Sequence, residues 1–260
     1  MENNINYSKL PYHQYFIDTN NDMNNKGNKS FEMKYNDVTY TWKGVVTHAN
    51  YEINYDNKRN VIQVHFQGTN DLPDWFTNFL FIPKYYDTFI WNNKKITLKV
   101  HNSWAAMYKV MKHFIRNGVK DLLALHKDAE VEVIGWSLGS GQAQLCVQDL
   151  YYNLGIKSHL FTFGSVNLFK TNIFNRHKIK KYLRSCCKEY HLFCHRNDIV
   201  TYVVPRIFGF IKIHRQNVKG KFNFFGLFRV LKYHCHYDEE NIYDKIIKKE
   251  NKLSRYLKCH

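Results

Sequence analysis

The sequence lacks several features that would place the chain in a membrane or a secretory pathway. No apolar run approaches the ~20 residues that a membrane-spanning helix needs. Residues 1–10 are polar and contain no apolar core of a secretory signal. We therefore expect a cytoplasmic protein whose six cysteines are reduced. Alanine is scarce, while Asn and Lys are abundant, which suggests an AT-rich genome such as that of a large DNA virus.

Acidic residues are also few. The chain has 22 Asp and Glu against 38 Lys and Arg, giving a formal net charge of +16. Such a surface attracts polyanions, so peripheral contact with an anionic membrane is one expected consequence. No zinc-finger spacing or RNA-binding signature accompanies the charge, and we expect no nucleic-acid partner. The histidines and cysteines lack the spaced clusters of a zinc site, so we expect no metal and no cofactor.

The chain shows no linker and no internal repeat, which predicts a single domain over residues 1–260. Residues 1–30 read as a polar N-terminal extension. Strand-like segments at 37–48, 59–68, 95–101, 131–135, 160–163, 190–194 and 231–236 alternate with helical runs at 103–126, 142–152 and 239–257. The first of these helical runs contains Asn117-Gly118, which predicts an interruption. This alternation predicts an α/β fold with a largely parallel sheet flanked by helices.

One motif carries nucleophilic chemistry. Residues 135–139 read G-W-S-L-G, which fits the G-x-S-x-G pattern of a nucleophile elbow. In that turn a strand passes sharply into a helix and exposes the serine hydroxyl above the sheet. The apolar run V-E-V-I precedes the motif and a helical run follows it. We therefore predict Ser137 as a catalytic nucleophile.

A nucleophilic serine needs a base and an acid that orients the base, and in this fold they follow in the order Ser, Asp, His. Asp149 falls inside the helix after the elbow, on the wrong side of the sheet. Asp198 follows the predicted strand at 190–194, and the carboxyl ends of strands are where open α/β sheets place their chemistry. His234 and His236 both lie on an apparent strand, and alternation puts them on one face, so periodicity does not choose between them.

Six blocks follow one another in order along the chain: residues 64–69 with Asp74-Trp75, residues 100–104, the elbow at 135–139, residues 161–165, residues 196–200, and His236 with Glu240. Together they resemble the class 3 lipases, a family of α/β-hydrolases that includes fungal triacylglycerol lipases. Five positions depart from the family pattern: Gln67 stands in place of Arg, Ser103 in place of Gly, Trp104 in place of Phe, Trp136 in place of His, and Ser140 in place of Gly or Ala.

The resemblance implies roles for individual residues. It implies a triad of Ser137, Asp198 and His236, because the spacing to Glu240 favours His236 over His234. It also implies an oxyanion hole from Thr69 and the backbone N–H of Leu138. Residues 71–81 match the position of the family's lid, and a substrate-binding surface follows from these and the residue before the nucleophile: Leu72, Trp75, Phe76, Phe79 and Trp136.

The sequence therefore predicts a serine carboxylic ester hydrolase, triacylglycerol lipase-like, that acts on a lipid ester through an acyl-enzyme intermediate. A phospholipase A1 acting on anionic membranes is the alternative within the same enzyme class. A catalytically inactive hydrolase-like module that binds lipid or protein is an alternative from another class. The sequence does not address the oligomeric state.

Overall fold

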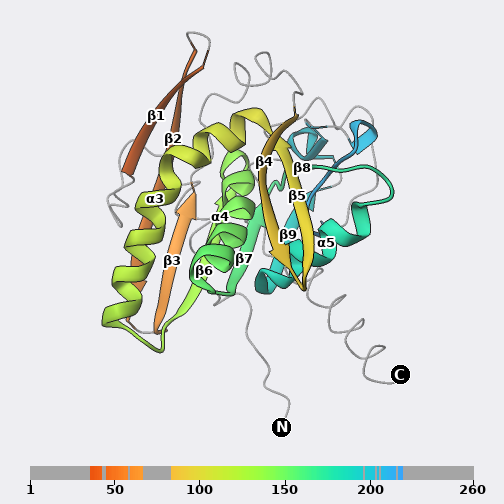
Figure 1. The fold of residues 1–260 in the computed structure, drawn as a ribbon. Helices are drawn as coiled ribbons and strands as arrows, with labels where there is room; N and C mark the ends of the chain where they lie inside the picture. The colour runs from red at the N-terminus through yellow and green to blue at the C-terminus, as the bar shows by residue number, and fades with distance from the viewer. Residues whose placement is uncertain are drawn as a thin grey trace.

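The computed structural model describes residues 36–42, 45–57, 59–66, 83–195, 197–202, 204, 206–214 and 216–218. Strands and helices alternate along the chain, as the sequence pattern predicts (Figure 1). In chain order the elements are β1 (Asn36–Trp42), β2 (Val45–Asp56), β3 (Val61–Phe66), β4 (Pro83–Trp91), β5 (Lys94–His101), α3 (Asn102–Leu125), β6 (Glu130–Trp136), α4 (Leu138–Leu154), β7 (Ser158–Phe163), β8 (Phe169–Lys170), α5 (Arg176–Ser185), β9 (Cys187–His195), η2 (Ile199–Tyr202), η3 (Arg206–Phe208), β10 (Phe210–Ile211) and β11 (Gln216–Val218).

The main sheet has seven strands in the order β1-β2-β3-β6-β7-β9-β11. The five strands from β3 to β11 are parallel, and β2 joins β3 antiparallel while β1 joins β2 antiparallel. The parallel strands are apolar on the face toward α3 and α4, where Val133 and Leu160 belong to the core. The largely parallel sheet predicted from the sequence is confirmed, with an antiparallel hairpin at one edge.

A second, four-stranded antiparallel sheet was not predicted. Its order is β10-β8-β5-β4, and two of its strands are only two residues long. Phe89 on β4 packs edge-on against Tyr152 of α4, with ring centroids 4.6 Å apart, and stacks on Tyr182 of α5 at 5.9 Å. The small sheet therefore covers α4 and α5 on the side away from β1 (Figure 1).

Helix α3 corrects one sequence-based prediction. It runs unbroken from Asn102 to Leu125, so the interruption expected at Asn117-Gly118 is wrong. A Cβ at Gly118 would lie 2.7 Å from Cδ1 of Ile53 on β2. The missing side chain lets the helix approach the sheet closely, and this packing outweighs the low helix propensity of glycine, about 1 kcal/mol relative to alanine. Along the described chain no helix is long and apolar enough to cross a bilayer.

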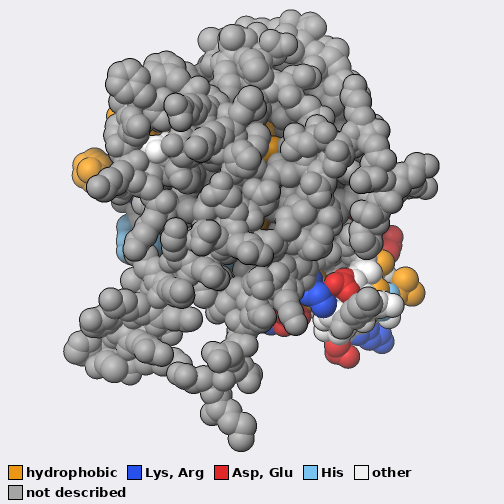
Figure 2. Space-filling view, turned by 180° about the vertical axis from the view of Figure 1, so that it is seen from behind, with side chains coloured by type: hydrophobic (Ala, Val, Ile, Leu, Met, Phe, Trp, Pro, Cys, Tyr) orange, Lys and Arg blue, Asp and Glu red, His pale blue; other side chains and the backbone are white. Residues whose placement is uncertain are grey.

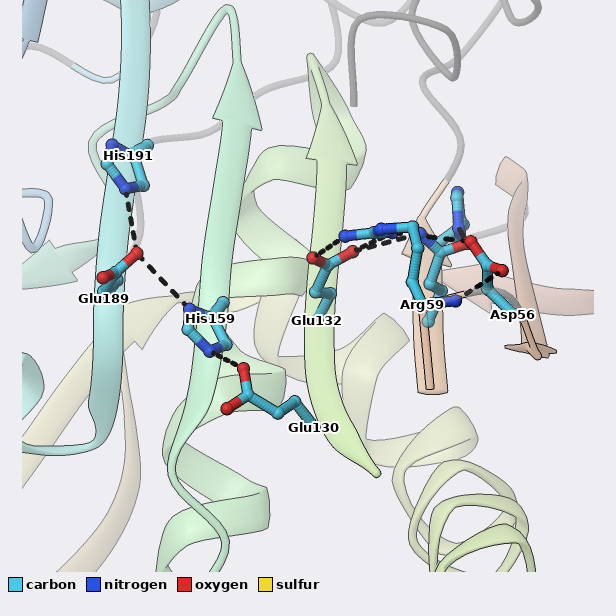
Figure 3. Close-up of polar contacts among 9 residues, drawn as sticks. Asp56, Arg59, Glu130, Glu132, His159, Glu189 and His191 are labelled. Atoms are coloured by element: carbon cyan, nitrogen blue, oxygen red, sulfur yellow. Dashed lines mark hydrogen bonds and ion pairs between the residues drawn. The ribbon is translucent and has the colours of Figure 1, made fainter. Parts of the chain in front are cut away.

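The sheet has two different faces. Seen from the side opposite α3 and α4, the described side chains include acidic and basic groups mixed together at one end (Figure 2). Close up, a polar row crosses β9, β7 and β6, where His159 lies between Glu130 at 2.7 Å and Glu189 at 3.5 Å (Figure 3). These carboxylates are about half exposed or more, and exposed ion pairs contribute little to stability.

This row lies near the amino ends of the parallel strands, since Glu130 is the first residue of β6. Arg59 joins the same face through a double hydrogen bond to Glu132 (Figure 3). The opposite, carboxyl edge of the sheet is where α/β proteins place their ligands. The polar row therefore lies at the end of the strands opposite to the one where chemistry is expected.

Candidate active site

The turn between β6 and α4 holds Ser137 in an unusual backbone conformation. Its φ is 55° and its ψ is −118°, while β6 ends at Trp136 and α4 begins at Leu138. A serine in this region is strained by about 1–3 kcal/mol, and such strain collects at functional sites. The strand–turn–helix context predicted for the elbow is therefore present, with Ser137 at the point where the chain reverses.

Glycine at position 135 makes this turn possible. A Cβ there would lie 2.3 Å from the carbonyl oxygen of Gly139 and 2.9 Å from Cβ of Ala143. No side chain fits in that space without moving the backbone of α4. The small residue two positions before the serine is thus required by the close packing of the helix start on the end of β6.

Hydrogen bonds from three sides fix the elbow. The Ser137 N–H donates to the carbonyl of Phe163 on β7 at 2.9 Å. The Ser140 hydroxyl donates to the Ser137 carbonyl at 2.6 Å and accepts the N–H of Val166 at 3.1 Å. Ser140, which departs from the family pattern, therefore links the first turn of α4 to the loop after β7. We call these two hydrogen bonds of the Ser140 hydroxyl the hydroxyl clamp, and they hold the elbow against the loop after β7.

The surroundings of the Ser137 hydroxyl differ from those of an ordinary buried serine. Ser137 is only 1% exposed, and its Oγ makes no hydrogen bond to any residue that the structure describes. A buried hydroxyl usually finds a partner, and leaving one unpaired costs about 1–3 kcal/mol. An unpaired buried hydroxyl on a strained serine is suited to receive a base or a substrate.

Asp198 lies at the same edge of the sheet as Ser137. Trp136 pairs with Phe163, which pairs with Phe193 on β9, so these three residues are level across the sheet. Ser137 follows Trp136 directly, and Asp198 comes five residues after Phe193, beyond the end of β9. Adjacent strands are about 4.8 Å apart, so β6 and β9 are separated by roughly 10 Å. The register thus brings both residues to the carboxyl edge.

The surroundings of Asp198 hold its carboxylate in place. The side chain is fully buried, and Oδ1 accepts the N–H of Val200 at 2.9 Å. The Asp198 carbonyl accepts the Thr201 hydroxyl at 2.9 Å, which closes the turn into η2. A buried carboxylate held in a fixed orientation is suited to orient an imidazole.

The other candidate acid has a different role. Asp149 on α4 accepts from Arg116 Nε at 2.7 Å and from the hydroxyl of Tyr108 at 3.2 Å, and both donors lie on α3. Arg116 Nη2 also contacts the second carboxylate oxygen at 2.5 Å. Asp149 therefore ties α3 to α4 through Arg116 and Tyr108, in agreement with its exclusion from the triad.

Trp104 is a supporting residue that sequence reasoning did not single out. Its indole is fully buried, and Nε1 donates to the carbonyl of Leu138 at 2.9 Å. A Cβ at Gly141 would lie 2.1 Å from the same Nε1, so α4 can accept the indole only where it carries a glycine. The sequence signal that could have identified Trp104 is the block at residues 100–104, where Trp104 occupies one position of the family pattern.

The first turn of α4 places backbone N–H donors near the serine. Leu138 is the first residue of the helix, and an N–H in a first turn has no partner within the helix. The helix start also carries a partial positive charge, about half an elementary charge. This geometry is suited to stabilise an oxyanion next to Ser137.

Trp136 is buried at 2% exposure, at the end of β6. By alternation it lies on the sheet face of Glu132, opposite the core residues Val131 and Val133. Most of the other predicted site residues lie outside the described residues, so their predicted roles stay predictions. They are Thr69, Leu72, Trp75, Phe76, Phe79, His234, His236 and Glu240.

The described cysteines are not part of this chemistry. Cys146, Cys186, Cys187 and Cys194 are free and buried, and burial raises the pKa of the Cys186 thiol to about 12. A thiol with so high a pKa is a poor nucleophile. Within the described ranges no group of three or more His, Cys, Asp or Glu side chains is arranged to hold a metal ion.

A strained serine between a parallel strand and a helix, with an aspartate after a later strand of the same edge, defines an α/β-hydrolase. Comparison with known proteins is more specific. The model of the family described as lipase (class 3) matches residues 63–208, more than half of the chain. The chain therefore belongs to the class 3 lipase family, which confirms the resemblance seen in the sequence.

Relatives and solved structures agree on the fold. The lipases of Rhizopus niveus and Rhizopus oryzae are each 27% identical over 179 residues, covering 67% of this chain and 42% of theirs. The structure of lipase II from Rhizopus niveus has a TM-score of 0.55 at 25% identity, covering 66% of this chain and 62% of that one. The Rhizopus microsporus var. chinensis lipase has a TM-score of 0.55 at 26% identity, covering 68% and 58%. The chain spans less than half the length of these curated relatives.

Proposed function

We propose that this chain hydrolyses carboxylic esters of lipids, as a triacylglycerol lipase-like serine hydrolase. The observation that carries the proposal is Ser137 itself. Its backbone is strained at φ 55°, and its buried hydroxyl makes no hydrogen bond to any described residue. Strain and an unpaired polar group both cost stability, and a function at this position accounts for both. Membership of the class 3 lipase family supports the same chemistry.

In the proposed mechanism His236 takes the proton of Ser137 as the hydroxyl attacks the ester carbonyl. Asp198 holds the imidazole in the required tautomer and stabilises the imidazolium that forms. The tetrahedral oxyanion is stabilised by the N–H of Leu138 and by Thr69. The alcohol then leaves with a proton from His236, and water releases the fatty acid from Ser137 by the reverse sequence.

The proposal includes a lid at residues 71–81. Ser137 is almost completely buried, so an ester must displace covering groups before it reaches Oγ. An apolar segment that shields the serine in water and opens against lipid would supply this access. Leu72, Trp75, Phe76 and Phe79 would form its apolar surface, and Trp136 would contribute to the acyl site.

A second candidate within the same chemistry is phospholipase A1 activity. The formal net charge of +16 favours it, because a basic protein accumulates on anionic phospholipid, at about 1 kcal/mol per Lys or Arg near the surface. The two candidates share Ser137 and differ in the substrate that reaches it. Initial rates on triolein and on an anionic phospholipid, at equal interfacial area, distinguish them.

The proposal is tested by hydrolysis of p-nitrophenyl esters of increasing acyl length, followed by triolein and phosphatidylglycerol. Ser137→Ala should abolish turnover on every ester. Ser158→Ala is the matched control, because Ser158 is also buried but lies at the start of β7, the opposite edge of the sheet. Activity that survives Ser137→Ala, or that Ser158→Ala removes equally, contradicts the assignment. A well-folded protein that hydrolyses none of these esters supports a binding module instead.

A further inference from the structure

A hollow away from the elbow combines basic and apolar groups. It has a volume of about 760 Å³ and lies between β5, the segment joining β8 to α5, and η3. Its basic lining residues are Lys99, Lys170 and Arg176. In Figure 1 α5 and this segment lie on the side of the molecule away from β1 and β2. We call this hollow and its rim the α5 surface.

The cations of the α5 surface are placed where they repel one another. Lys99 on β5 and Lys170 on β8 are directly opposite in an antiparallel pair, an arrangement that destabilises a sheet. Lys170 gains a partial compensation from the ring of Phe210, whose centroid is 5.3 Å from Nζ. Among the described residues, no carboxylate lines the hollow. An anion bound between these cations would relieve the repulsion.

The sequence around the hollow strengthens its positive field. No Asp or Glu occurs between Asp149 and Glu189, nor between Asp198 and Asp238. The first of these stretches contains β8 and α5, and the second contains η3. The helix α5 reads R-H-K-I-K-K-Y-L-R-S, with basic residues and no acidic residue. The part of the chain that forms this surface therefore lacks the acidic neighbours that would neutralise it.

Apolar side chains project at the rim of the same hollow. Ile173 is 78% exposed, Phe174 is 89% exposed and Ile207 is 86% exposed. Ile173 and Ile207 line the hollow, and Phe174 follows Ile173 directly. A single exposed apolar residue is ordinary, but a group of three beside a cationic hollow marks an interaction site.

We infer that the α5 surface docks on an anionic phospholipid bilayer. The hollow receives the phosphate of a lipid headgroup between Lys99, Lys170 and Arg176. The three apolar side chains at the rim enter the interfacial layer of the bilayer. A soluble phosphate would satisfy the cations but leave the apolar rim in water, and a nucleic acid would do the same. The bilayer matches both halves of the surface.

Docking on a bilayer is a property separate from ester hydrolysis, so it is tested by vesicle binding alone. The full-length protein is mixed with vesicles of phosphatidylcholine alone, or with 30% phosphatidylglycerol, a composition that sets roughly the charge of an anionic membrane. No ester assay is involved, and bound protein is measured by flotation. Binding should be at least about tenfold stronger with phosphatidylglycerol and should weaken as salt rises from about 0.05 to 0.5 M.

Two triple variants separate the two halves of the surface. Replacing Lys99, Lys170 and Arg176 by Gln should remove the preference for anionic vesicles. Replacing Ile173, Phe174 and Ile207 by Ser should weaken binding to anionic vesicles about tenfold or more, because each loses its burial in lipid. Phe174→Ser alone, at the most exposed of these positions, gives a smaller loss in the same direction and tests the rim with little risk to folding.

Matched controls lie on the other side of the molecule. Lys109, Lys120 and Lys127 are exposed on and after α3, and their replacement by Gln makes the same change in net charge. Phe114→Ser removes another exposed aromatic side chain from α3. Both controls should bind vesicles like the unchanged protein. A control triple that loses as much binding as the α5 triple overturns the proposal, as does binding indifferent to lipid charge.

Turnover of a soluble short-chain ester distinguishes the proposed hydrolysis at Ser137 from the proposed docking of the α5 surface. None of the α5 variants touches the elbow, so their turnover should equal that of the unchanged protein. Loss of vesicle binding with unchanged turnover supports the α5 surface. If the protein hydrolyses no ester at all, the flotation result still decides whether the surface docks. Binding of glycerol phosphate or an oligonucleotide in place of vesicles overturns the proposal.

Discussion

The strain at Ser137 makes a prediction about stability as well as activity. Ser137→Gly and Ser137→Ala both remove the hydroxyl, so they differ only in how readily each residue adopts φ 55° and ψ −118°. Alanine keeps the strain of about 1–3 kcal/mol, whereas glycine adopts this conformation freely. Glycine loses about 0.5–1 kcal/mol more conformational entropy on folding. The difference leaves Ser137→Gly more stable than Ser137→Ala by about 1 kcal/mol.

Urea unfolding followed by tryptophan fluorescence measures this difference. The control is the same pair of substitutions at Ser140, which lies in α4 with no positive φ. There alanine should be the more stable residue, by about 1 kcal/mol, as in any helix. The sign of the Gly–Ala difference should thus reverse between two serines three residues apart. Equal signs at the two positions would refute the claim that Ser137 is strained.

Three further predictions concern His101, the fully buried last residue of β5, then Trp104 beside the elbow, and the two candidate catalytic histidines. Burial lowers the pKa of His101 to about 3, while the unfolded chain titrates near 6.5, so the free energy of unfolding should fall as pH drops through this range. The slope is at most about 1.4 kcal/mol per pH unit for this group, and His101→Phe should flatten the curve measured by urea unfolding at several pH values. Trp104→Phe removes the indole N–H that donates to the Leu138 carbonyl, and should cost about 2 kcal/mol of stability with reduced kcat in ester assays. Unchanged values would show that Trp104 does not support the elbow. His236→Ala should eliminate ester turnover while His234→Ala retains most of it, and the reverse result would exchange their roles.

The elbow could be predicted because its signal is local. The spacing G-x-S-x-G, an apolar strand before it and a helical run after it are all visible within about twenty residues, and β6, Ser137 and α4 occupy the predicted places. Asp198 could be placed at the carboxyl edge for the same reason, since it directly follows a strand. A short stretch of sequence contains the whole determinant in both cases.

Contacts between distant segments could not be predicted in this way. Strands β8 and β10 have two residues each. The pairing of β10 with β8, and of β8 with β5, depends on the folded arrangement rather than on any alternation along the chain. The uninterrupted α3 depends on a contact between Gly118 and Ile53, on different elements. The hydroxyl clamp of Ser140 likewise requires Val166, which lies after β7. Tertiary packing decides each of these features.

The most direct test of the proposed chemistry is to find where a serine-reactive probe attaches. A p-nitrophenyl phosphonate ester with an alkyl chain is incubated with the full-length protein, and peptides are then mapped by mass spectrometry. The proposed mechanism predicts one adduct per chain, on Ser137, and none in Ser137→Ala, with loss of ester turnover in proportion to labelling. An adduct on another residue, or full turnover by a completely labelled protein, would contradict Ser137 as the nucleophile.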